Sequence, residues 1–343
     1  MELDTVIVTG AGGLVGSTAV KFFSKIADHV IGIENNSRQI YFGRESSIHN
    51  VVKNLRGIQN FRLIGADIRS LSYSKLKSII SGQVSLIIHA AAQPSHDWAA
   101  QDPVSDFTVN ANGTLHLLEF LRLECPEAVF IHMSTNKVYG DNPNKLPLIE
   151  TPTRFDHPTP IAEDMPIEAD LHSLFGVSKL SADFLAQEYG KYYGLKTTSL
   201  RAGCITGSSQ QGAKLHGFLN YLVRTFKTKQ SYEIIGYKGK QVRDNIHVDD
   251  LTTLFYEIYK NPGYGAVFNI GGGEQSNCSV LEAICKCEDL FGYAIPIHIS
   301  DIPRKGDHKW YVSDLTKIKK AYPNWRLTFN IDSIIKELAE GQE

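Results

Sequence analysis

Short apolar runs rich in valine and isoleucine alternate, in the first part of the chain, with longer segments that have helical spacing. The runs lie at residues 5–10, 29–34, 61–67, 85–92, 128–135 and 196–203. A strand that is apolar along its whole length is buried on both faces, so this pattern predicts a parallel sheet covered by helices. Strands joined by helical crossovers indicate an α/β fold with a Rossmann-type doubly wound sheet.

The pattern changes after residue 203. We predict a helix, a strand–loop–strand unit, a strand that enters a glycine turn, and a second helix, over residues 214–228, 232–251, 266–273 and 279–292. We therefore expect a cofactor-binding Rossmann domain over residues 1–203, with return segments near 235–275. Residues 204–343 are expected to form, for the most part, a smaller α/β substrate-binding lobe at the carboxyl edge of the sheet, where such sheets bind ligands.

Composition excludes several classes of protein. The 343 residues include 35 basic and 37 acidic side chains, so no basic face for nucleic acid is expected. The five cysteines form no CxxC pair, so we predict reduced thiols and no metal site. No run reaches the roughly 18 apolar residues of a membrane span. The N-terminus has the character of a strand of a mature protein and not of a signal peptide, and we expect a cytoplasmic location.

The segment TGAGGLVG follows the first predicted strand and opens the first predicted helix. It places Gly10, Gly13 and Gly16 at the spacing GxxGxxG, with Leu14 and Val15 between the last two. Residues without a Cβ allow a tight turn, and the free N–H groups of a helix N-terminus attract a pyrophosphate. The motif predicts a dinucleotide site; the alternative is a glycine-rich turn without a ligand.

Glu34 ends the second predicted strand, eighteen residues after Gly16. A carboxylate there can accept both hydroxyls of the adenosine ribose and repel a 2′-phosphate, which favours NAD over NADP. Asn35 adjoins it, and Arg38 is the residue that could argue for NADP. Asp67 and Ile68 follow the third strand and suit an adenine-binding edge, or are a plain strand end.

At this point several motifs together resemble a known family, the extended short-chain dehydrogenases/reductases that act on nucleotide sugars as epimerases and dehydratases. They are the glycine motif, HAAAQ (89–93), STNKVYGD (134–141), FGVSK (175–179), QVRDNIHVDDL (241–251) and FNIGGG (268–273). The resemblance spans nearly the whole chain and is strongest to members that epimerise CDP-linked sugars at C2. It implies NAD as cofactor, a nucleotide-sugar substrate, and a homodimer formed by helices near 103–124 and 173–194.

The resemblance also implies roles for single residues. Thr135 would hydrogen-bond the reacting sugar hydroxyl, and Lys179 would hold the nicotinamide ribose and act on a neighbouring tyrosine. Further cofactor contacts would come from Ala90, Ala91 and Gln93. Substrate contacts would come from Asn136, His96, Arg243 and Arg304, the two arginines lying on the diphosphate.

Phe175 departs from the family pattern, because it stands where the family has its proton-transferring tyrosine. Three explanations remain open: an engineered change, a natural phenylalanine with the base elsewhere, or a protein that binds without catalysis. One candidate base is Lys137, which lies two residues beyond Thr135 on the same strand end, so that the strand period of two places both side chains on one side. His172 is a second candidate, and His96 with Asp97 could face the sugar or the nicotinamide.

These observations predict an NAD-dependent nucleotide-sugar epimerase, acting at C2 of a CDP-linked hexose or deoxyhexose through a transient keto-sugar. The alternatives are a nucleotide-sugar 4,6-dehydratase and a non-catalytic NAD or sugar-nucleotide binding protein. The pair Asn136-Lys137 after Thr135 lacks the acid that a dehydratase uses. The long segment 140–170 is predicted to cover the sugar, the alternative being a disordered excursion. His89 and His132 are expected to be satisfied core residues.

Overall fold

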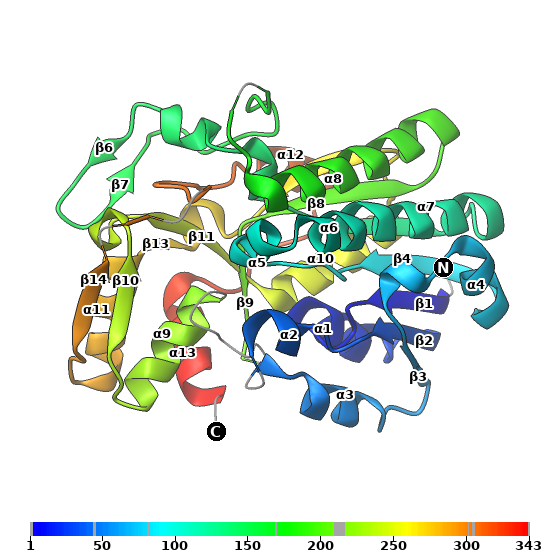
Figure 1. Ribbon diagram of the computed structural model, residues 1–343, viewed down its shortest axis with the longest axis horizontal. Coiled ribbons are helices and arrows are strands. Elements are labelled where there is room, and N and C mark those ends of the chain that lie inside the picture. Colours follow the sequence, from blue (N-terminus) through cyan, green and yellow to red (C-terminus); the bar gives the residue numbers. More distant parts are fainter. Residues whose placement is uncertain are drawn as a thin grey trace. The chain divides into compact units, whose positions relative to one another are not determined.

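The computed structural model describes residues 3–43, 46–80, 82–168, 170–208, 217–300, 302–303 and 306–341 (Figure 1). The chain divides into two compact units, each made of three segments. The first unit consists of Met1–Val138, Leu174–Arg201 and Leu251–Phe268, and the second of Tyr139–Ser173, Ala202–Asp250 and Asn269–Glu343. Assignment of the cofactor to one domain and of the substrate to the other stays a prediction.

The first unit is built on a seven-stranded sheet whose strand order is β12-β8-β5-β4-β1-β2-β3. The strands are β1 (Leu3–Thr9), β2 (Ala27–Glu34), β3 (Phe61–Gly65), β4 (Val84–His89), β5 (Val129–Thr135), β8 (Thr197–Ala202) and β12 (Ala266–Ile270). β1 pairs in parallel with both β2 and β4, so the strand order reverses beside β1. The fold class predicted from the sequence is confirmed, and the late strand β12 joins this sheet.

Helices cover both faces of this sheet (Figure 1). One apolar core unites Leu76 of α4, Leu117 of α7 and Ala186 of α8 with Ile7 and Phe130 of the strands. On the other helical layer, Phe22 of α1 lies 6.2 Å from Tyr256 of α10, measured between ring centroids. The helices and helical turns of this part are α1 (Leu14–Phe23), α2 (Arg38–Phe42), α3 (His49–Leu55), η2 (Ile68–Ser70), α4 (Tyr73–Ile79), α5 (His96–Gln101), α6 (Pro103–Phe107), the π-helical turn η3 (Thr108–Asn112), α7 (Gly113–Glu124), η4 (Asn136–Tyr139), α8 (Ser173–Tyr193) and α10 (Val248–Lys260).

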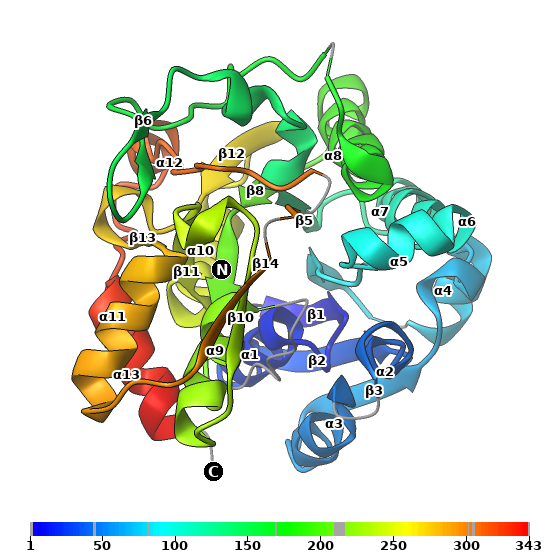
Figure 2. The same cartoon turned by 60° about the vertical axis from the view of Figure 1, so that its left-hand side comes forward.

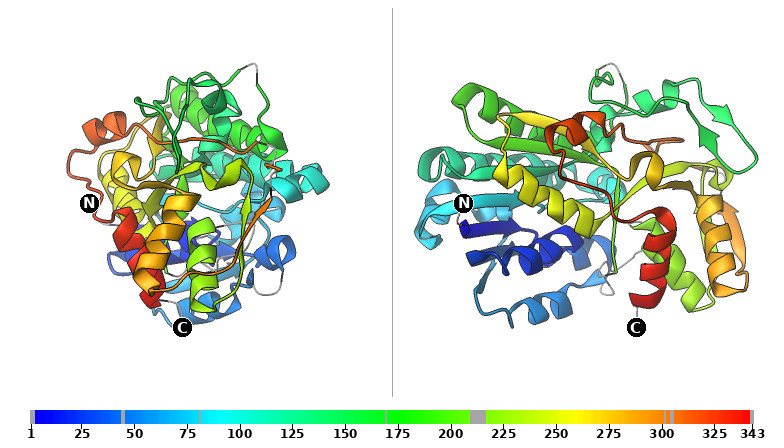
Figure 3. Two further views of the ribbon diagram at one scale, coloured as in Figure 1. Left: turned by 90° about the vertical axis from the view of Figure 1, so that its left-hand side faces the viewer. Right: turned by 180° about the vertical axis from the view of Figure 1, so that it is seen from behind.

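The second unit contains a cluster of three helices packed around an apolar core. Leu222 and Phe226 of α9, Ile284 of α11, and Ile334 and Leu338 of α13 are buried there. Figures 2 and 3 show these three helices side by side. The helices of the cluster are α9 (Phe218–Lys227), α11 (Val280–Phe291) and α13 (Ile331–Gly341), and the unit also contains α12 (Thr316–Ala321). The predicted helix over 214–228 is therefore found from Phe218 on, and its first residues lie outside the described part of the chain.

Short strands complete this unit. β10 (Tyr232–Ile235) pairs in parallel with β14 (Ile297–Ser300), and β11 (Val242–His247) lies between β9 (Cys204–Thr206) and β13 (Asn277–Ser279). Short helical turns occur at η5 (Asn142–Lys145), η6 (Tyr237–Gly239) and η7 (Gly273–Gln275). Among the described residues, no helix combines the length and the apolar character that a membrane crossing requires.

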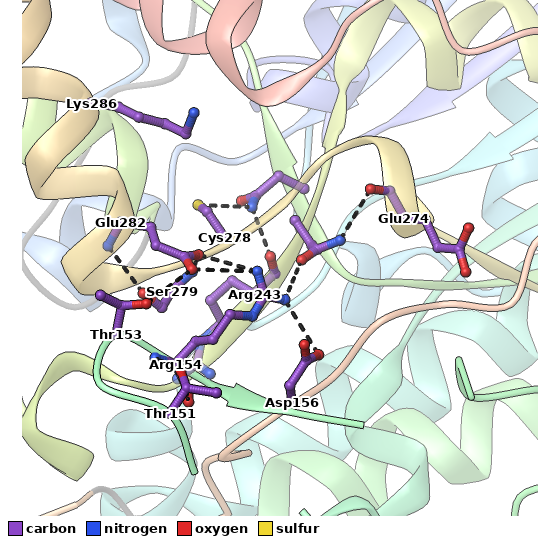
Figure 4. A network of polar contacts seen from close by, with 12 residues as sticks. Thr151, Thr153, Arg154, Asp156, Arg243, Glu274, Cys278, Ser279, Glu282 and Lys286 are labelled. Carbon is purple, nitrogen blue, oxygen red and sulfur yellow. Dashed lines mark hydrogen bonds and ion pairs between the residues drawn. The ribbon is translucent and has the colours of Figure 1, made fainter. Parts of the chain in front are cut away.

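The segment predicted as a long cover contains a small antiparallel hairpin, β6 (Ile149–Glu150) and β7 (Phe155–Asp156). Arg154, beside β7, donates hydrogen bonds to Glu282 at 3.2 Å and to Asn277 at 2.7 Å (Figure 4). Glu282 also accepts the N–H of Ser279 at 2.8 Å and so caps α11. One carboxylate thus holds both the hairpin and a helix N-terminus, and the segment has ordered contacts of its own.

Candidate active site

The glycine loop between β1 and α1 is shaped by close main-chain contacts. Gly10 has φ +68°, and a Cβ on it would lie 2.9 Å from the Cα of Ala91, two residues after the end of β4. A Cβ on Gly16 would lie 2.1 Å from the carbonyl oxygen of Gly10. Both positions require glycine for the loop to close on itself and on the neighbouring strand.

Gly13 has no such internal reason to be glycine. It is the N-cap of α1 with φ −72°, and a Cβ there would meet only the Gly10 carbonyl oxygen, at 3.4 Å. Among the described residues no side chain caps this helix, and Gly13, Leu14 and Val15 are all partly exposed. A glycine with room around it, at an uncapped helix N-terminus, fits the close approach of a pyrophosphate to the main chain.

Glu34 at the end of β2 lies against this loop. Its carboxylate accepts the N–H of Gly12 at 3.0 Å, and those of Asn35 and Asn36 at 2.8 and 2.7 Å. The carboxylate is partly exposed, so it can accept further donors. A carboxylate that binds the adenosine ribose is expected at this position, beside the glycine loop that would hold the pyrophosphate.

The next residues predicted for the cofactor have different surroundings. Asp67 accepts hydrogen bonds from Asn35 at 3.1 Å and from Arg69 at 2.7 Å, and the hydrogen bond from Arg69 contributes most to lowering the pKa of Asp67. Ile68 is buried in the core, so any contact with an adenine would involve its main chain. Arg38 begins α2, and burial lowers the pKa of its guanidinium.

The loop after β4 is fixed by a buried polar network that connects it to α8. Gln93 donates to Asp106 at 2.8 Å, Asn110 donates to Asp106 at 3.1 Å and to Ser178 at 2.9 Å, and Ser178 donates to the carbonyl oxygen of Phe175 at 3.0 Å. Burial raises the pKa of Asp106. The Gln93 side chain is fully buried and shapes this loop.

Sequence reasoning missed most of this network, namely Asp106, Asn110 and Ser178. The available signal was the spacing of Asp106, Asn110 and Thr114, which places three polar side chains one helical turn apart on a segment that the resemblance implies to be a helix. Thr114 continues the network, because its hydroxyl lies 2.9 Å from Nε2 of His89.

Lys179 is buried in α8 and donates to the carbonyl oxygen of Met133 at 2.7 Å. Burial lowers the pKa of its ammonium group to about 8, partly offset by the charges of Asp183 and Asp106. Met133 lies in β5, two residues before Thr135, so Lys179 is brought to the carboxyl end of that strand.

The segment after β5 corrects one expectation. The strand ends at Thr135, and Asn136 and Lys137 belong to the helical turn η4. The prediction that a strand period of two places Lys137 on the same side as Thr135 is therefore wrong. The Thr135 hydroxyl closes this turn by accepting the N–H of Lys137 at 3.3 Å and donating to Asn136 at 3.4 Å.

Phe175 packs against His96. Their ring centroids are 4.8 Å apart and their planes are inclined by 58°. Phe175 is 7% exposed, whereas His96 is partly exposed at the first residue of α5. The imidazole of His96 therefore lies next to Phe175, at the position where the family resemblance implies a tyrosine.

Other predicted histidines differ from one another. His89 is satisfied by the hydroxyls of Thr9 and Thr114, as expected of a core residue. His132 is fully buried, but neither of its ring nitrogens has a hydrogen-bond partner among the described residues, so the expectation of a satisfied histidine is wrong there. In the second unit, Nδ1 of His172 lies 2.9 Å from the carbonyl oxygen of Asp170, and its buried Nε2 has no partner within the described part of that unit.

Arg243, also in the second unit, projects from β11 and forms an ion pair with Asp307 through two contacts of 2.7 and 2.8 Å. It donates as well to the carbonyl oxygen of His308 at 2.7 Å. Arg304 lies outside the described residues. Asp307, which follows Arg304 in the same motif, is the ion-pair partner of Arg243, a contact that the sequence alone did not give.

Comparison with known proteins agrees with this geometry. The family model described as "NAD dependent epimerase/dehydratase family" matches residues 6–271. CDP-paratose 2-epimerase of Salmonella typhi is 30% identical over 325 residues, which cover 92% of each protein. dTDP-glucose 4,6-dehydratase of Escherichia coli is 26% identical and covers 98% of this chain and 91% of its own.

The fold has solved counterparts. A Tyr-to-Phe mutant of UDP-glucuronic acid 4-epimerase from Bacillus cereus, in complex with UDP-4-deoxy-4-fluoro-glucuronic acid and NAD, superposes with a TM-score of 0.80. It is 24% identical and covers 98% of both chains. NAD as the cofactor, predicted from the glycine motif and Glu34, is confirmed by the family model. The glycine loop between β1 and α1 fits this cofactor. The chain belongs to the NAD-dependent epimerase/dehydratase family.

Proposed function

We propose that the protein is a nucleotide-sugar epimerase that inverts C2 of a CDP-linked hexose or deoxyhexose. The observation that carries the proposal is the segment after β5, where the Thr135 hydroxyl is followed by an amide and an amine, and not by a carboxylic acid. Dehydration across C5–C6 needs an acid and a base at the substrate, whereas epimerisation needs a single proton acceptor. The match to CDP-paratose 2-epimerase along nearly the whole chain supports the same choice.

In this proposal, different residues of the first unit bind the cofactor, orient the sugar hydroxyl and stabilise its negative charge. The main chain of Gly13 and the carboxylate of Glu34 hold the cofactor, which when bound supplies reversible hydride transfer. The Thr135 hydroxyl orients the sugar hydroxyl that loses its proton. The Lys179 ammonium, desolvated and with its pKa lowered to about 8, places positive charge where the hydroxyl becomes negative.

The substrate nucleotide is assigned to the second unit. Arg243 presents a guanidinium whose fork geometry matches a diphosphate, and Asp307 fixes its orientation. Arg304 stays a second predicted diphosphate ligand. The choice of a CDP-linked over a UDP-linked sugar rests on the relative named above and on no contact in the structure.

A 4,6-dehydratase is the second candidate, because relatives with that activity match 98% of this chain. The experiment that separates the two uses a CDP-hexose labelled with deuterium at C2, incubated with the protein and NAD and followed by NMR. Epimerisation by internal return of hydride would give the C2 epimer with the deuterium retained. A dehydratase would instead give a 4-keto-6-deoxy sugar with solvent hydrogen at C5, which would contradict the proposal. The same assay with UDP-hexoses tests the nucleotide preference, and binding without turnover of either class would favour a non-catalytic sugar-nucleotide binding protein.

We also infer a homodimer from one apolar surface of the first unit, which we call the α6–α8 surface. Its exposed members are Val104 and Phe107 of α6 and Val177 and Phe184 of α8, of which Val104 is 71% exposed. A groove of about 410 Å³ runs between Phe107, Leu115 and Phe184. Exposed apolar surface of this kind marks an association site, and the two helical segments are those that the resemblance assigns to dimerisation.

A further inference from the structure

The contact between His96 and Phe175 has a cause in the surrounding structure. Ser95 is the N-cap of α5, and its hydroxyl accepts the N–H of Trp98 at 3.2 Å. The main-chain N–H and carbonyl groups of Ser95 are both held by Gln93. His96, the next residue, therefore begins its helix at a fixed position.

The same loop is tied to α8, which carries Phe175. The Asp106 carboxylate accepts hydrogen bonds from the side chains of Gln93 and Asn110. Asn110 also donates to the hydroxyl of Ser178 at 2.9 Å. Ser178 then donates to the carbonyl oxygen of Phe175 at 3.0 Å. All four side chains are buried, so the main chain next to His96 and the carbonyl group of Phe175 are held by one continuous hydrogen-bonded network.

Within the described part of the first unit, neither Phe175 nor Lys179 offers a free acceptor for the proton of a sugar hydroxyl. The phenyl ring has no titratable group, and Lys179, one helical turn further on, donates its ammonium hydrogen to the Met133 carbonyl oxygen. Thr135 is engaged in closing the turn η4. His96 brings a titratable ring to 4.8 Å from the Phe175 ring and remains partly exposed, whereas Phe175 is buried.

We propose that His96 is the catalytic residue that accepts the proton of the reacting sugar hydroxyl, in the role that a tyrosine at position 175 would otherwise have. The inference rests on the proposed epimerase function. When the sugar is oxidised, the O–H bond breaks and its proton passes to an imidazole nitrogen. The C–H bond breaks with its electron pair, as hydride, to NAD, and a C=O bond forms. On return of the hydride to the other face, the imidazolium gives its proton back to the oxygen.

Imidazole suits this exchange because histidine titrates between about pH 5 and 8, so that it can both take and return a proton near neutrality. In this arrangement His96 would transfer the proton in place of a tyrosine, and Lys179 would keep its role of supplying positive charge.

The test compares wild type with His96→Asn, Phe175→Tyr and the double variant, using His29→Asn as control because His29 is exposed at the start of β2. Loss of one general base costs roughly 10²–10⁴ in rate. We therefore expect His96→Asn to lower kcat by at least about a hundredfold, with KM for the CDP-hexose and the affinity for NAD changed less than about threefold. The acidic limb of the pH–rate profile should disappear. Adding Phe175→Tyr to His96→Asn should restore at least about tenfold of the loss, and His29→Asn should behave as wild type.

A second readout does not depend on turnover. In protein labelled with ¹³C at Cε1 of histidine, the resonance absent from His96→Asn identifies His96. It should shift when the CDP-hexose binds to the protein–NAD complex, and its titration should match the acidic limb of the rate profile. This readout also shows whether His96→Asn still folds, through the unchanged remaining resonances.

Three outcomes would overturn the assignment of His96: unchanged kcat in His96→Asn, a resonance that ignores the substrate while turnover proceeds, or loss of activity on His172→Asn but not on His96→Asn. An inactive wild type that becomes active on Phe175→Tyr would also overturn it, while the epimerase scaffold would stand. If neither wild type nor Phe175→Tyr turns over any CDP- or UDP-hexose, the proposed function itself fails. The two failures are therefore distinguishable.

Discussion

The carboxylate of Glu34 accepts a hydrogen bond of 3.0 Å from the main-chain N–H of Gly12, so the acid that ends β2 is fastened to the glycine loop that follows β1. Main-chain hydrogen bonds to both of its oxygens thus hold the carboxylate in place before any ligand arrives. Glu34→Ala should weaken NAD binding about tenfold or more, because a hydrogen bond to a charged group contributes ~1.5–3 kcal/mol.

The same substitution should improve binding of NADP relative to NAD, because the charge that repels a 2′-phosphate is gone. Isothermal titration calorimetry with NAD and with NADP checks the ratio of the two affinities. Glu127→Ala is the matched control, since Glu127 is an exposed carboxylate that forms an ion pair with Lys196, away from the glycine loop in the sequence. An unchanged NADP-to-NAD ratio in Glu34→Ala would remove Glu34 from the cofactor site.

Two glycines of one motif should respond in opposite ways to alanine. A Cβ at Gly16 would lie 2.1 Å from the Gly10 carbonyl oxygen, so Gly16→Ala should lower the free energy of unfolding by about 1–3 kcal/mol. Gly13→Ala meets only one atom, at 3.4 Å, and should leave the melting temperature nearly unchanged. If the pyrophosphate lies on Gly13, this variant should nevertheless lose NAD affinity; stability by calorimetry and binding by fluorescence separate the two effects.

Lys179 should make stability depend on alkaline pH. Its pKa is about 8 in the folded state, below the ordinary lysine value of 10.5 that represents the unfolded chain. Between these values the folded protein has released the proton that the unfolded chain keeps. The free energy of unfolding attributable to Lys179 should therefore rise with pH across this window, by roughly 3 kcal/mol in total, and be lost again as pH falls to 7.

The comparison is between wild type and Lys179→Met in urea unfolding at pH 7.5 and 9.5. Lys179→Met should be the more stable protein at pH 7.5, and its advantage should shrink at pH 9.5, since other groups titrate in both proteins alike. A constant difference between the two proteins would mean that the Lys179 ammonium is hydrated in solution.

Arg154 should stabilise the β6–β7 hairpin through its bonds to Glu282 and Asn277. The side chains of Arg154 and Glu282 are 22% and 25% exposed, so water still screens their ion pair. We therefore expect Arg154→Ala to lower the free energy of unfolding by ~1 kcal/mol. The clearer readout is limited proteolysis, which should become faster between residues 140 and 170.

Lys240→Ala is the control for Arg154→Ala, because Lys240 contacts the same hairpin through Glu150, which is 57% exposed. It should change the proteolysis rate little. Equal rates for the two variants would show that Arg154 contributes no more than a surface pair.

The α6–α8 surface predicts an assembly state. A charge in its apolar groove would have to be desolvated on association, so Phe184→Glu should convert a dimer to a monomer in sedimentation velocity. Leu290→Glu is matched to it, since both side chains are 44% exposed but Leu290 belongs to α11 in the second unit. A wild-type protein that sediments as a monomer at high concentration would contradict the homodimer.

The sequence was sufficient for the parallel sheet, since its strands are long apolar runs, and for the glycine cradle, since glycine spacing has a direct steric meaning. It was misleading at Lys137, because a one-residue difference in where a strand ends changes which way a side chain points. The contact between His96 and Phe175 could not be predicted, because the residues are far apart in the chain and are joined by the buried bonds of Gln93, Asp106 and Asn110. Such a network depends on tertiary packing and leaves only a faint spacing signal in the sequence.

The position of β12 at the end of the sheet, beside β8, has a consequence for how the protein is made. β8 is complete at residue 202, but its outer neighbour begins only at residue 266. At synthesis rates of roughly 5–20 residues per second, a nascent chain would expose the unpaired edge of β8 for several seconds before that strand leaves the ribosome. During that interval the growing chain offers an open template for another strand, so chaperone contact with β8 would be most useful before the last quarter of the protein has been translated.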